Sequence, residues 1–339
     1  MIMRDTNLLH RVLRFLTTVG LPVIAAIVEG VQPWLIYATL GAILAFLGDE
    51  GGSPLRRLGY MTIGPAGLVV GAAAGTATGA LPIPFLIIIF TLGLFYGLVE
   101  GGHDHLLLLS RFIGYGLVMG NAVTPLDLAD CAAAGAAVVD AWGTSLLWDL
   151  ARGGLRPLGV QPVGTATKAA LTNWRTRWIF SLCAGLVIVA ANLAGVWLGL
   201  GHPYWATLTI LVVLRSEMEP SADLITDRVL GTLLGVAAVA LLVTAAPGQG
   251  PLLGGMIIAA ALRWPAFRFH VALGTAAITA FVLLLGEILA ASPPAANHLL
   301  QDRLLATMVG CCFAMAGIGL YRIFKRQLTT APTVGEHSR

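Results

Sequence analysis

Charged side chains are scarce in this sequence. Aspartate, glutamate, lysine and arginine make up 11% of the 339 residues, whereas soluble domains carry about a quarter. Hydrophobic residues make up 57%, and the mean hydropathy is +0.85. This composition excludes an ordinary soluble domain and predicts a chain that crosses a membrane several times. The net charge of +3 is small, so we expect no nucleic-acid partner.

Motifs for catalysis and metal binding are also missing. No HExxH, GxSxG or Walker A pattern occurs, so we expect neither an enzyme nor an ATP-driven pump. The four cysteines, Cys131, Cys183, Cys311 and Cys312, lie in apolar runs without metal-ligand spacing. We expect them to be small core residues, with no bound metal or cofactor.

The apolar segments are long and unbroken, which favours membrane-spanning helices over a barrel of alternating strands. The sequence predicts an all-α polytopic membrane protein with about twelve transmembrane helices. The candidate spans are residues 13–30, 34–48, 58–79, 83–99, 105–123, 126–148, 178–200, 204–217, 226–246, 250–262, 268–290 and 299–323. The spans 204–217 and 250–262 are shorter than the ~20 residues that cross a bilayer, as half-helices lining a cavity would be.

The distribution of basic residues indicates the topology, because cytoplasmic loops carry an excess of lysine and arginine. With the N-terminus inside, the predicted outer loops contain neither residue. Arg111, within the fifth span, and Arg303, near the outer end of the twelfth, are the exceptions. We therefore expect both termini in the cytoplasm, and a retained first helix rather than a cleaved signal peptide.

The two halves of the chain resemble each other. A shift of 171 residues places Trp34 on Trp205, Arg57 on Arg228 and Gly64 on Gly235. Both halves begin on the inside, so we predict two parallel six-helix repeats about an axis along the membrane normal. We place the first repeat at 1–150, a cytoplasmic linker at 151–177, the second repeat at 178–325 and a cytoplasmic tail at 326–339.

A second echo lies within the C-terminal half. Asp227-Arg228-Val-Leu-Gly-Thr-Leu-Leu-Gly235 shares five of nine positions with Asp302-Arg303-Leu-Leu-Ala-Thr-Met-Val-Gly310. In the predicted topology the two copies run in opposite directions, which favours inverted three-helix repeats nested in each half. Chance similarity between apolar helices is the alternative. In the first half Asp130 corresponds to Asp302, but Cys131 replaces Arg303.

Arginines near or within the predicted spans are candidates for function, because a charge at the centre of a membrane helix costs at least ~2.5–3.5 kcal/mol. Arg57 and Arg228 lie at the inner ends of spans, where they either anchor the helix at the interface or bind an anion. Arg303 and Arg111 either attract an anion or form an ion pair with a neighbouring aspartate.

Other side chains within the spans are also candidates. Asp140, near the middle of the sixth span, and Asp130 are candidates for proton coupling, and a salt bridge to Arg111 is the structural alternative. Trp34, Tyr204 and Trp205 lie at the predicted outer interface, where they form either an aromatic belt or a stacking surface for a substrate ring. A ladder of glycines at positions 67, 71, 75 and 79 predicts close packing of the third span.

These residues carry a resemblance to a known family. Pro203-Tyr204-Trp205-Ala206-x-Leu208-Thr209 and Asp227-Arg228-x-x-Gly231-Thr232-x-x-Gly235 resemble the fusaric acid resistance protein-like family, also called aromatic acid exporters. Arg303-x-x-x-Thr307-x-x-Gly310 fits a later helix of the same domain. The resemblance covers about 190–320, and in the first half it holds at Trp34, Arg57 and Gly64.

The resemblance implies a bacterial inner-membrane protein that exports aromatic or other organic acids, often with a periplasmic adaptor protein. The family is also similar to plant aluminium-activated malate transporters, which are dimeric anion channels with basic pores. In that picture the two halves mimic the dimer, and Arg57, Arg228 and Arg303 face a shared pore.

The leading hypothesis is a secondary transporter that exports small aromatic carboxylate anions. Arg57, Arg228, Arg303 and Arg111 would bind the carboxylate, Trp34, Tyr204 and Trp205 the ring, and Asp140 or Asp130 would relay a proton. An anion channel with the same arginines, and a structural or accessory subunit of an envelope assembly, are the alternatives. The expected partners are the organic anion, the lipid bilayer, a periplasmic adaptor and further copies of the chain.

Overall fold

The computed structural model describes residues 8–28, 30, 34–79, 81–100, 104–123, 125–159, 174–216, 218–246, 248–289 and 295–330. These residues form twelve α-helices and one short π-helix, with no strand among them. In chain order the helices are α1 (Leu8–Val28), α2 (Trp34–Leu47), α3 (Pro54–Thr78), α4 (Pro82–Val99), α5 (Asp104–Val118), η1 (Met119–Val123), α6 (Leu128–Ala151), α8 (Trp174–Trp197), α9 (Tyr204–Val213), α10 (Met218–Ala245), α11 (Gln249–Phe269), α12 (Val271–Leu289) and α13 (Ala295–Thr330).

Nine of the described helices are long and apolar enough to cross a membrane. Two more apolar helical segments, Leu35–Leu47 of α2 and Tyr204–Val213 of α9, are shorter. Helices suit this environment because their backbone groups are hydrogen-bonded within the segment itself. The prediction of an all-α, multi-pass membrane protein is therefore confirmed, and the count of twelve crossings stays a prediction.

Two of the predicted helix boundaries are wrong in ways that affect the site. The apolar run at 250–262 is not a short span, because α11 continues through Pro265 to Phe269 and has 21 residues. The helix predicted to begin at residue 226 begins at Met218. The sequence from Met218 to Asp227 is polar enough to look like a loop, but it forms the first turns of α10. This change moves Arg228 from the end of a helix into its interior.

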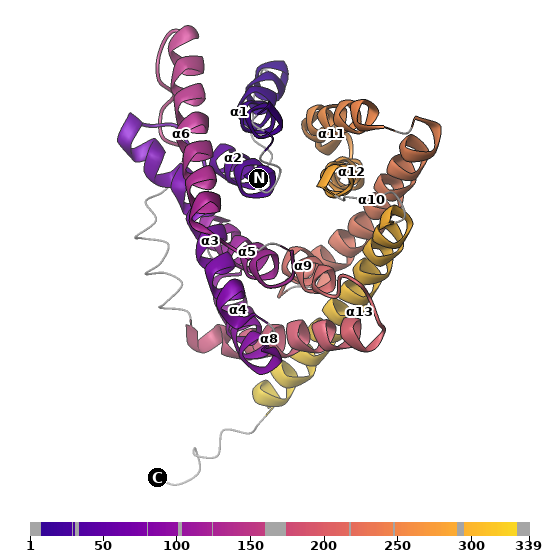
Figure 1. Ribbon diagram of the computed structural model, residues 1–339. Coiled ribbons are helices and arrows are strands. Elements are labelled where there is room, and N and C mark those ends of the chain that lie inside the picture. Colours follow the sequence, from indigo (N-terminus) through magenta and orange to yellow (C-terminus); the bar gives the residue numbers. More distant parts are fainter. Residues whose placement is uncertain are drawn as a thin grey trace, which may run out of the picture.

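The two halves of the chain lie on opposite sides of the molecule in Figure 1, the first in indigo to magenta and the second in salmon to yellow. Helices that correspond under the 171-residue shift make corresponding contacts. Thus α3 packs along α5 and α10 along α12, while α2 packs against α6 and α9 against α13. The halves meet where α4 lies along α8 and where α1 contacts α11, two contacts that the shift exchanges.

Glycines allow α3 and α5 to approach each other closely. A Cβ atom on Gly71 would collide with the carbonyl oxygen of Ile113, and one on Gly75 with the carbonyl oxygen of Leu117. The predicted packing role of this glycine ladder is confirmed at both positions. In lipid, such close backbone approach replaces much of the hydrophobic driving force that acts between helices in water.

This contact gives a direct test of the fold. We expect Gly71→Val to lower the free energy of unfolding by about 1–3 kcal/mol, because the added atoms would push α3 away from the α5 backbone. Thermal unfolding in detergent measures the loss. Gly59→Val is the matched control, because Gly59 lies on the same helix and nothing lies within 4 Å of the position its Cβ would take. Equal losses for the two variants would contradict the packing role.

Candidate functional site

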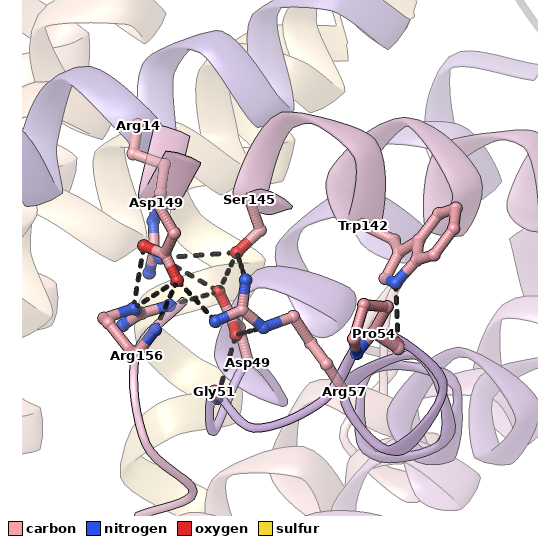
Figure 2. Close-up of polar contacts among 9 residues, drawn as sticks. All are labelled: Arg14, Asp49, Gly51, Pro54, Arg57, Trp142, Ser145, Asp149 and Arg156. Atoms are coloured by element: carbon pink, nitrogen blue, oxygen red, sulfur yellow. Dashed lines mark hydrogen bonds and ion pairs between the residues drawn. The ribbon is translucent and has the colours of Figure 1, made fainter. Parts of the chain in front are cut away.

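The first half of the chain contains a buried cluster of charged side chains, which we call the ion cluster (Figure 2). It consists of Arg14 on α1, Asp49 after α2, Arg57 on α3, Ser145 and Asp149 on α6, and Arg156 in the segment that follows α6. Asp49 accepts from Arg14 at 2.9 Å, from Arg156 at 2.7 Å and from the Ser145 hydroxyl. Asp149 accepts from Arg57 at 2.5 Å and from Arg156 at 3.0 Å.

The ion cluster compensates the charge of Arg57, whose side chain is fully buried. Its Nη2 bonds to Asp149, and its Nε lies 3.2 Å from Asp49 Oδ1 without the alignment of a hydrogen bond. A buried arginine between two carboxylates has its counter-charge within the protein. This geometry favours a structural role for Arg57 over the predicted binding of a substrate anion.

The same contacts shift the pKa values of Asp49 and Arg156, the two members of the ion cluster that lie outside the spans. Burial alone would raise the pKa of Asp49, but Arg14, Arg156, the Ser145 hydroxyl and Arg57 together hold it below the ordinary value. Burial alone would lower the pKa of Arg156, but Asp49 and Asp149 raise it above the ordinary value. Both shifts favour the charged forms of these two residues, so Asp49 and Arg156 are ionised at neutral pH.

The second half contains two buried arginines in a different situation. Arg228 on α10 is 7% exposed and Arg303 on α13 is 4% exposed. In both, Nε is buried without a hydrogen-bond partner. Among the described residues, neither guanidinium lies within ion-pair distance of a carboxylate. The two charges nevertheless lie close enough to act on each other. We call Arg228 and Arg303 the arginine pair.

Aromatic rings and hydroxyl groups surround the arginine pair. Cζ of Arg303 lies 4.8 Å from the centroid of the Trp205 ring, a cation–π contact. Tyr204 on α9 and Tyr115 on α5 lie within electrostatic range of Arg303. The Thr232 hydroxyl, one helical turn after Arg228, is buried without a partner. These groups are donors and ring faces that a carboxylate or an aromatic acid can contact.

The placement of the arginine pair differs from the prediction, which had Arg228 at an inner helix end and Arg303 at an outer one. Arg228 lies ten residues after Met218, the start of α10, and Arg303 lies eight residues after Ala295, the start of α13. Both therefore lie more than two turns inside their helices. α10 and α13 are in contact, and the two arginines, which the prediction placed on opposite sides of the membrane, lie within electrostatic range of each other.

Among the described residues, Arg111 donates hydrogen bonds to backbone carbonyls at the end of α9, and not to an aspartate. Its Nε donates to the carbonyl of Leu211 at 2.8 Å, and its Nη2 to that of Val212 at 3.3 Å. The Tyr96 hydroxyl donates to the carbonyl of Leu214. These carbonyls belong to the last turn of α9 and to Leu214, the residue that follows it, where the oxygens lack partners within the helix. Arg111 and Tyr96 therefore fix the end of the short helix that begins with Tyr204 and Trp205.

The predicted aromatic residues are only partly described. Tyr204 and Trp205 are 7% and 8% exposed, so their rings lie inside the protein and not in an aromatic belt facing lipid. Trp34 begins α2, and its side chain lies outside the described part of the structure. The ring-stacking role predicted for Tyr204 and Trp205 keeps its geometric support, because both lie beside Arg303.

The two predicted proton carriers lie apart from the arginine pair. Asp130 is the third residue of α6, where its side chain and that of Asp127 form reciprocal hydrogen bonds with the backbone at the helix start. Asp140 is half-buried, and its Oδ2 has no hydrogen-bond partner. Arg111 pairs with neither of them within the described residues. Its role in capping α6 explains the position of Asp130 without a role in proton transfer.

Several residues of interest were missed from the sequence. Arg14, Asp49, Asp149 and Arg156 are ordinary charges near the ends of apolar runs, and only contacts between distant segments make them a cluster. Arg263 falls between the predicted spans 250–262 and 268–290, but it lies inside α11 with its Cζ 4.9 Å from the centroid of the Trp264 ring.

Glu287, inside α12, has a buried Oε1 without a hydrogen-bond partner. Because a carboxylate within an apolar span is costly, Glu287 could have been identified from the sequence as a candidate functional residue.

Comparison with known proteins gives a family for part of the chain. Residues 186–317 match the model of the family described as fusaric acid resistance protein-like. The predicted resemblance is confirmed for this stretch. The match includes both members of the arginine pair and none of the ion cluster.

A protein of Synechocystis sp., described as uncharacterized, is 32% identical over 128 residues. The alignment covers 37% of this chain but only 16% of that relative, so the two proteins share one segment of a much longer sequence. No solved structure matches the chain.

The ion cluster predicts how stability depends on pH. Because the pKa of Asp49 is lowered on folding, its stabilising contribution is complete above the unfolded value of ~3.9 and is lost as the pH falls through the folded value. We expect the melting temperature in detergent to fall steeply below about pH 4. Asp49→Asn should lower stability at pH 7 by about 3 kcal/mol, because it leaves buried arginines uncompensated, and should weaken the acid dependence.

The control for this prediction is Asp223→Asn, which removes an exposed carboxylate of α10. It should leave both the stability at pH 7 and the acid transition unchanged. An Asp49→Asn protein as stable as the wild type would show that the ion cluster does not support the fold.

Proposed function

We propose that the chain is a secondary transporter that exports small organic carboxylate anions across the bacterial inner membrane, with the arginine pair as its anion-binding group. One observation carries the proposal. Arg228 and Arg303 are buried, close to each other and without a carboxylate partner among the described residues. The family match over residues 186–317 supports a membrane protein of the transporter type.

The energetic argument starts from the cost of an uncompensated charge. An isolated ion in an apolar interior is strongly unfavourable, and proteins normally pair such groups or let them reach water. Two guanidinium groups within electrostatic range also repel each other. A ligand that brings negative charge relieves both costs at once. Strained or uncompensated groups of this kind concentrate at functional sites, where they bind or react.

The surroundings of the pair support an organic acid as substrate. Arginine presents a planar fork of donors that matches the two oxygens of a carboxylate. Trp205 and Tyr204 offer ring faces within the same group of side chains. The pair carries two positive charges, which one dicarboxylate or two monocarboxylates would balance. An aromatic carboxylate would use both the fork and the rings.

The arrangement of the two halves supports the proposal of two parallel repeats with different roles. Corresponding contacts in the two halves fit two parallel six-helix repeats across twelve spans. Arg57 and Arg228 occupy equivalent positions under the shift, but among the described residues only Arg57 of the two has carboxylate partners. We propose that the first half has become a scaffold held by the ion cluster, while the second half keeps the binding site.

Transport provides the first test. We expect protein reconstituted in liposomes to bind and move benzoate, with a dicarboxylate such as malate as the comparison. Arg303→Gln and Arg228→Gln should each weaken binding at least tenfold, because a charge-assisted hydrogen bond contributes about 1.5–3 kcal/mol. Calorimetry measures the affinity for benzoate, and flux into or out of the liposomes measures its transport.

Arg56→Gln, which removes an exposed arginine, is the control. Wild-type binding in both arginine-pair variants would contradict the proposal. An anion current that does not change with the pH gradient across the membrane would indicate a channel and not a carrier.

Stability provides a second test, which separates binding arginines from structural ones. We expect Arg303→Gln to raise the free energy of unfolding without ligand by about 1 kcal/mol or more, because it removes an uncompensated buried charge. Arg57→Gln should lower it by about 3 kcal/mol, because it leaves Asp49 and Asp149 short of a partner. Melting in detergent without added anions measures both. If Arg303→Gln destabilises as much as Arg57→Gln, Arg303 is structural.

A further inference from the structure

Two histidine–aspartate pairs flank the arginine pair. Nδ1 of His202 lies 3.0 Å from Oδ2 of Asp302, and Nδ1 of His270 lies 3.3 Å from Oδ1 of Asp227. Each aspartate directly precedes one arginine of the pair, Asp302 before Arg303 and Asp227 before Arg228. The two similar segments of α10 and α13 therefore share a further feature. In each, the aspartate contacts a histidine from another part of the chain.

Only the first of these pairs is linked to its arginine through an aromatic ring. The imidazole of His202 stacks on the Trp205 ring, with the centroids 5.0 Å apart and the planes at 17°. The same Trp205 ring carries the cation–π contact with Arg303. His270 is 61% exposed at its side chain, and among the described residues no ring joins it to Arg228.

We propose that His202 and Asp302 form the proton-binding site of this transporter, and that proton binding there is coupled to anion binding at Arg303. The inference rests on the proposed function and adds the coupling ion and its site. With Nδ1–H donated to Asp302, the neutral imidazole has a free acceptor at Nε2. A proton from water binds at Nε2, and no other bond forms or breaks. The His202 side chain is 35% exposed, so water can reach it.

The charged and titratable groups around His202 define the effect of this proton. On α9 Tyr204 meets the imidazole edge-to-face at 5.6 Å. On α13 the imidazole faces Asp302, and Arg303 of the same helix contacts the Trp205 ring on which the imidazole stacks. Arg228 on α10 lies within electrostatic range of Arg303. Leu193 to Trp197, the last residues of α8, carry no titratable side chain. The Asp302 carboxylate therefore faces His202, and the Trp205 ring connects His202 to Arg303.

Protonation makes the anion site more attractive to anions. Neutral imidazole leaves the two arginines and Asp302 with a net charge of +1, and imidazolium raises it to +2. A bound carboxylate offsets the added charge, so the proton and the anion favour each other's binding. By linkage each must strengthen the other by the same factor, which is typically 5- to 150-fold between coupled sites.

Histidine is suited to this coupling because imidazoles change charge between about pH 5 and 8. Asp130, which caps α6, and Asp140, which lies apart from the arginine pair, have no comparable contact with the anion site. The His202–Trp205–Arg303 stack provides such a contact.

The experiment measures benzoate affinity of the full-length protein in detergent between pH 8 and 5.5, together with proton uptake by calorimetry in buffers of different ionisation enthalpy. We expect wild-type affinity to rise on the order of tenfold on acidification, with uptake of protons on binding. His202→Gln and Asp302→Asn should flatten the pH profile and keep measurable binding at pH 8. His270→Gln is the matched control and should keep the wild-type profile.

The outcomes separate this inference from the proposed function. Benzoate binding that is independent of pH, without proton uptake, overturns the coupling while leaving the anion site in place. A flattened profile in His270→Gln and an unchanged one in His202→Gln would also overturn it. Absence of anion binding at every pH, or wild-type binding by Arg303→Gln, would instead reject the proposed function. The wild-type measurement decides even if a variant fails to fold.

Discussion

The balance of buried charge is the constraint on which this structure depends. In a helical bundle surrounded by lipid, a guanidinium group must have a carboxylate, water or a ligand as its counterpart. The first half provides carboxylates for its arginines, because Arg14, Arg57 and the partly exposed Arg156 share Asp49 and Asp149. The second half does not, because neither Arg228 nor Arg303 reaches a carboxylate among the described residues. This difference, more than burial or position alone, distinguishes an arginine that holds helices together from one available to an anion.

The equivalence of Arg57 and Arg228 under the 171-residue shift shows why sequence position alone does not reveal function. The two residues occupy corresponding helices, α3 and α10, and both are buried. Arg57 has Asp149 as a partner, and the shift carries Asp149 onto Leu320, which cannot compensate a charge. It carries Asp49 onto Pro220. Corresponding helix positions therefore hold one arginine with carboxylate partners and one without such a partner among the described residues.

The helices and their packing devices were predictable from the sequence, whereas the partners of the charged residues were not. Apolar runs locate helices because the bilayer requires internally hydrogen-bonded segments. The spacing of Gly71 and Gly75 indicates close approach for the same local reason. Asp149 lies 92 residues from Arg57 and Leu211 lies 100 residues from Arg111, and no local pattern encodes such contacts. The polar start of α10 was missed because its composition resembles a loop, and that error placed Arg228 at a helix end.

The dependence of the site on both halves follows from the shortness of α9. This helix has ten residues and carries Tyr204 and Trp205 at its start. A helix that ends inside the protein leaves carbonyls that must be satisfied. Arg111 and Tyr96, both from the first half, donate to the carbonyls of Leu211, Val212 and Leu214. The first half thus fixes the position of the rings beside Arg303, although its own arginines are occupied. The two halves therefore differ in how their buried arginines are compensated, while the position of α9 in the second half depends on side chains of the first.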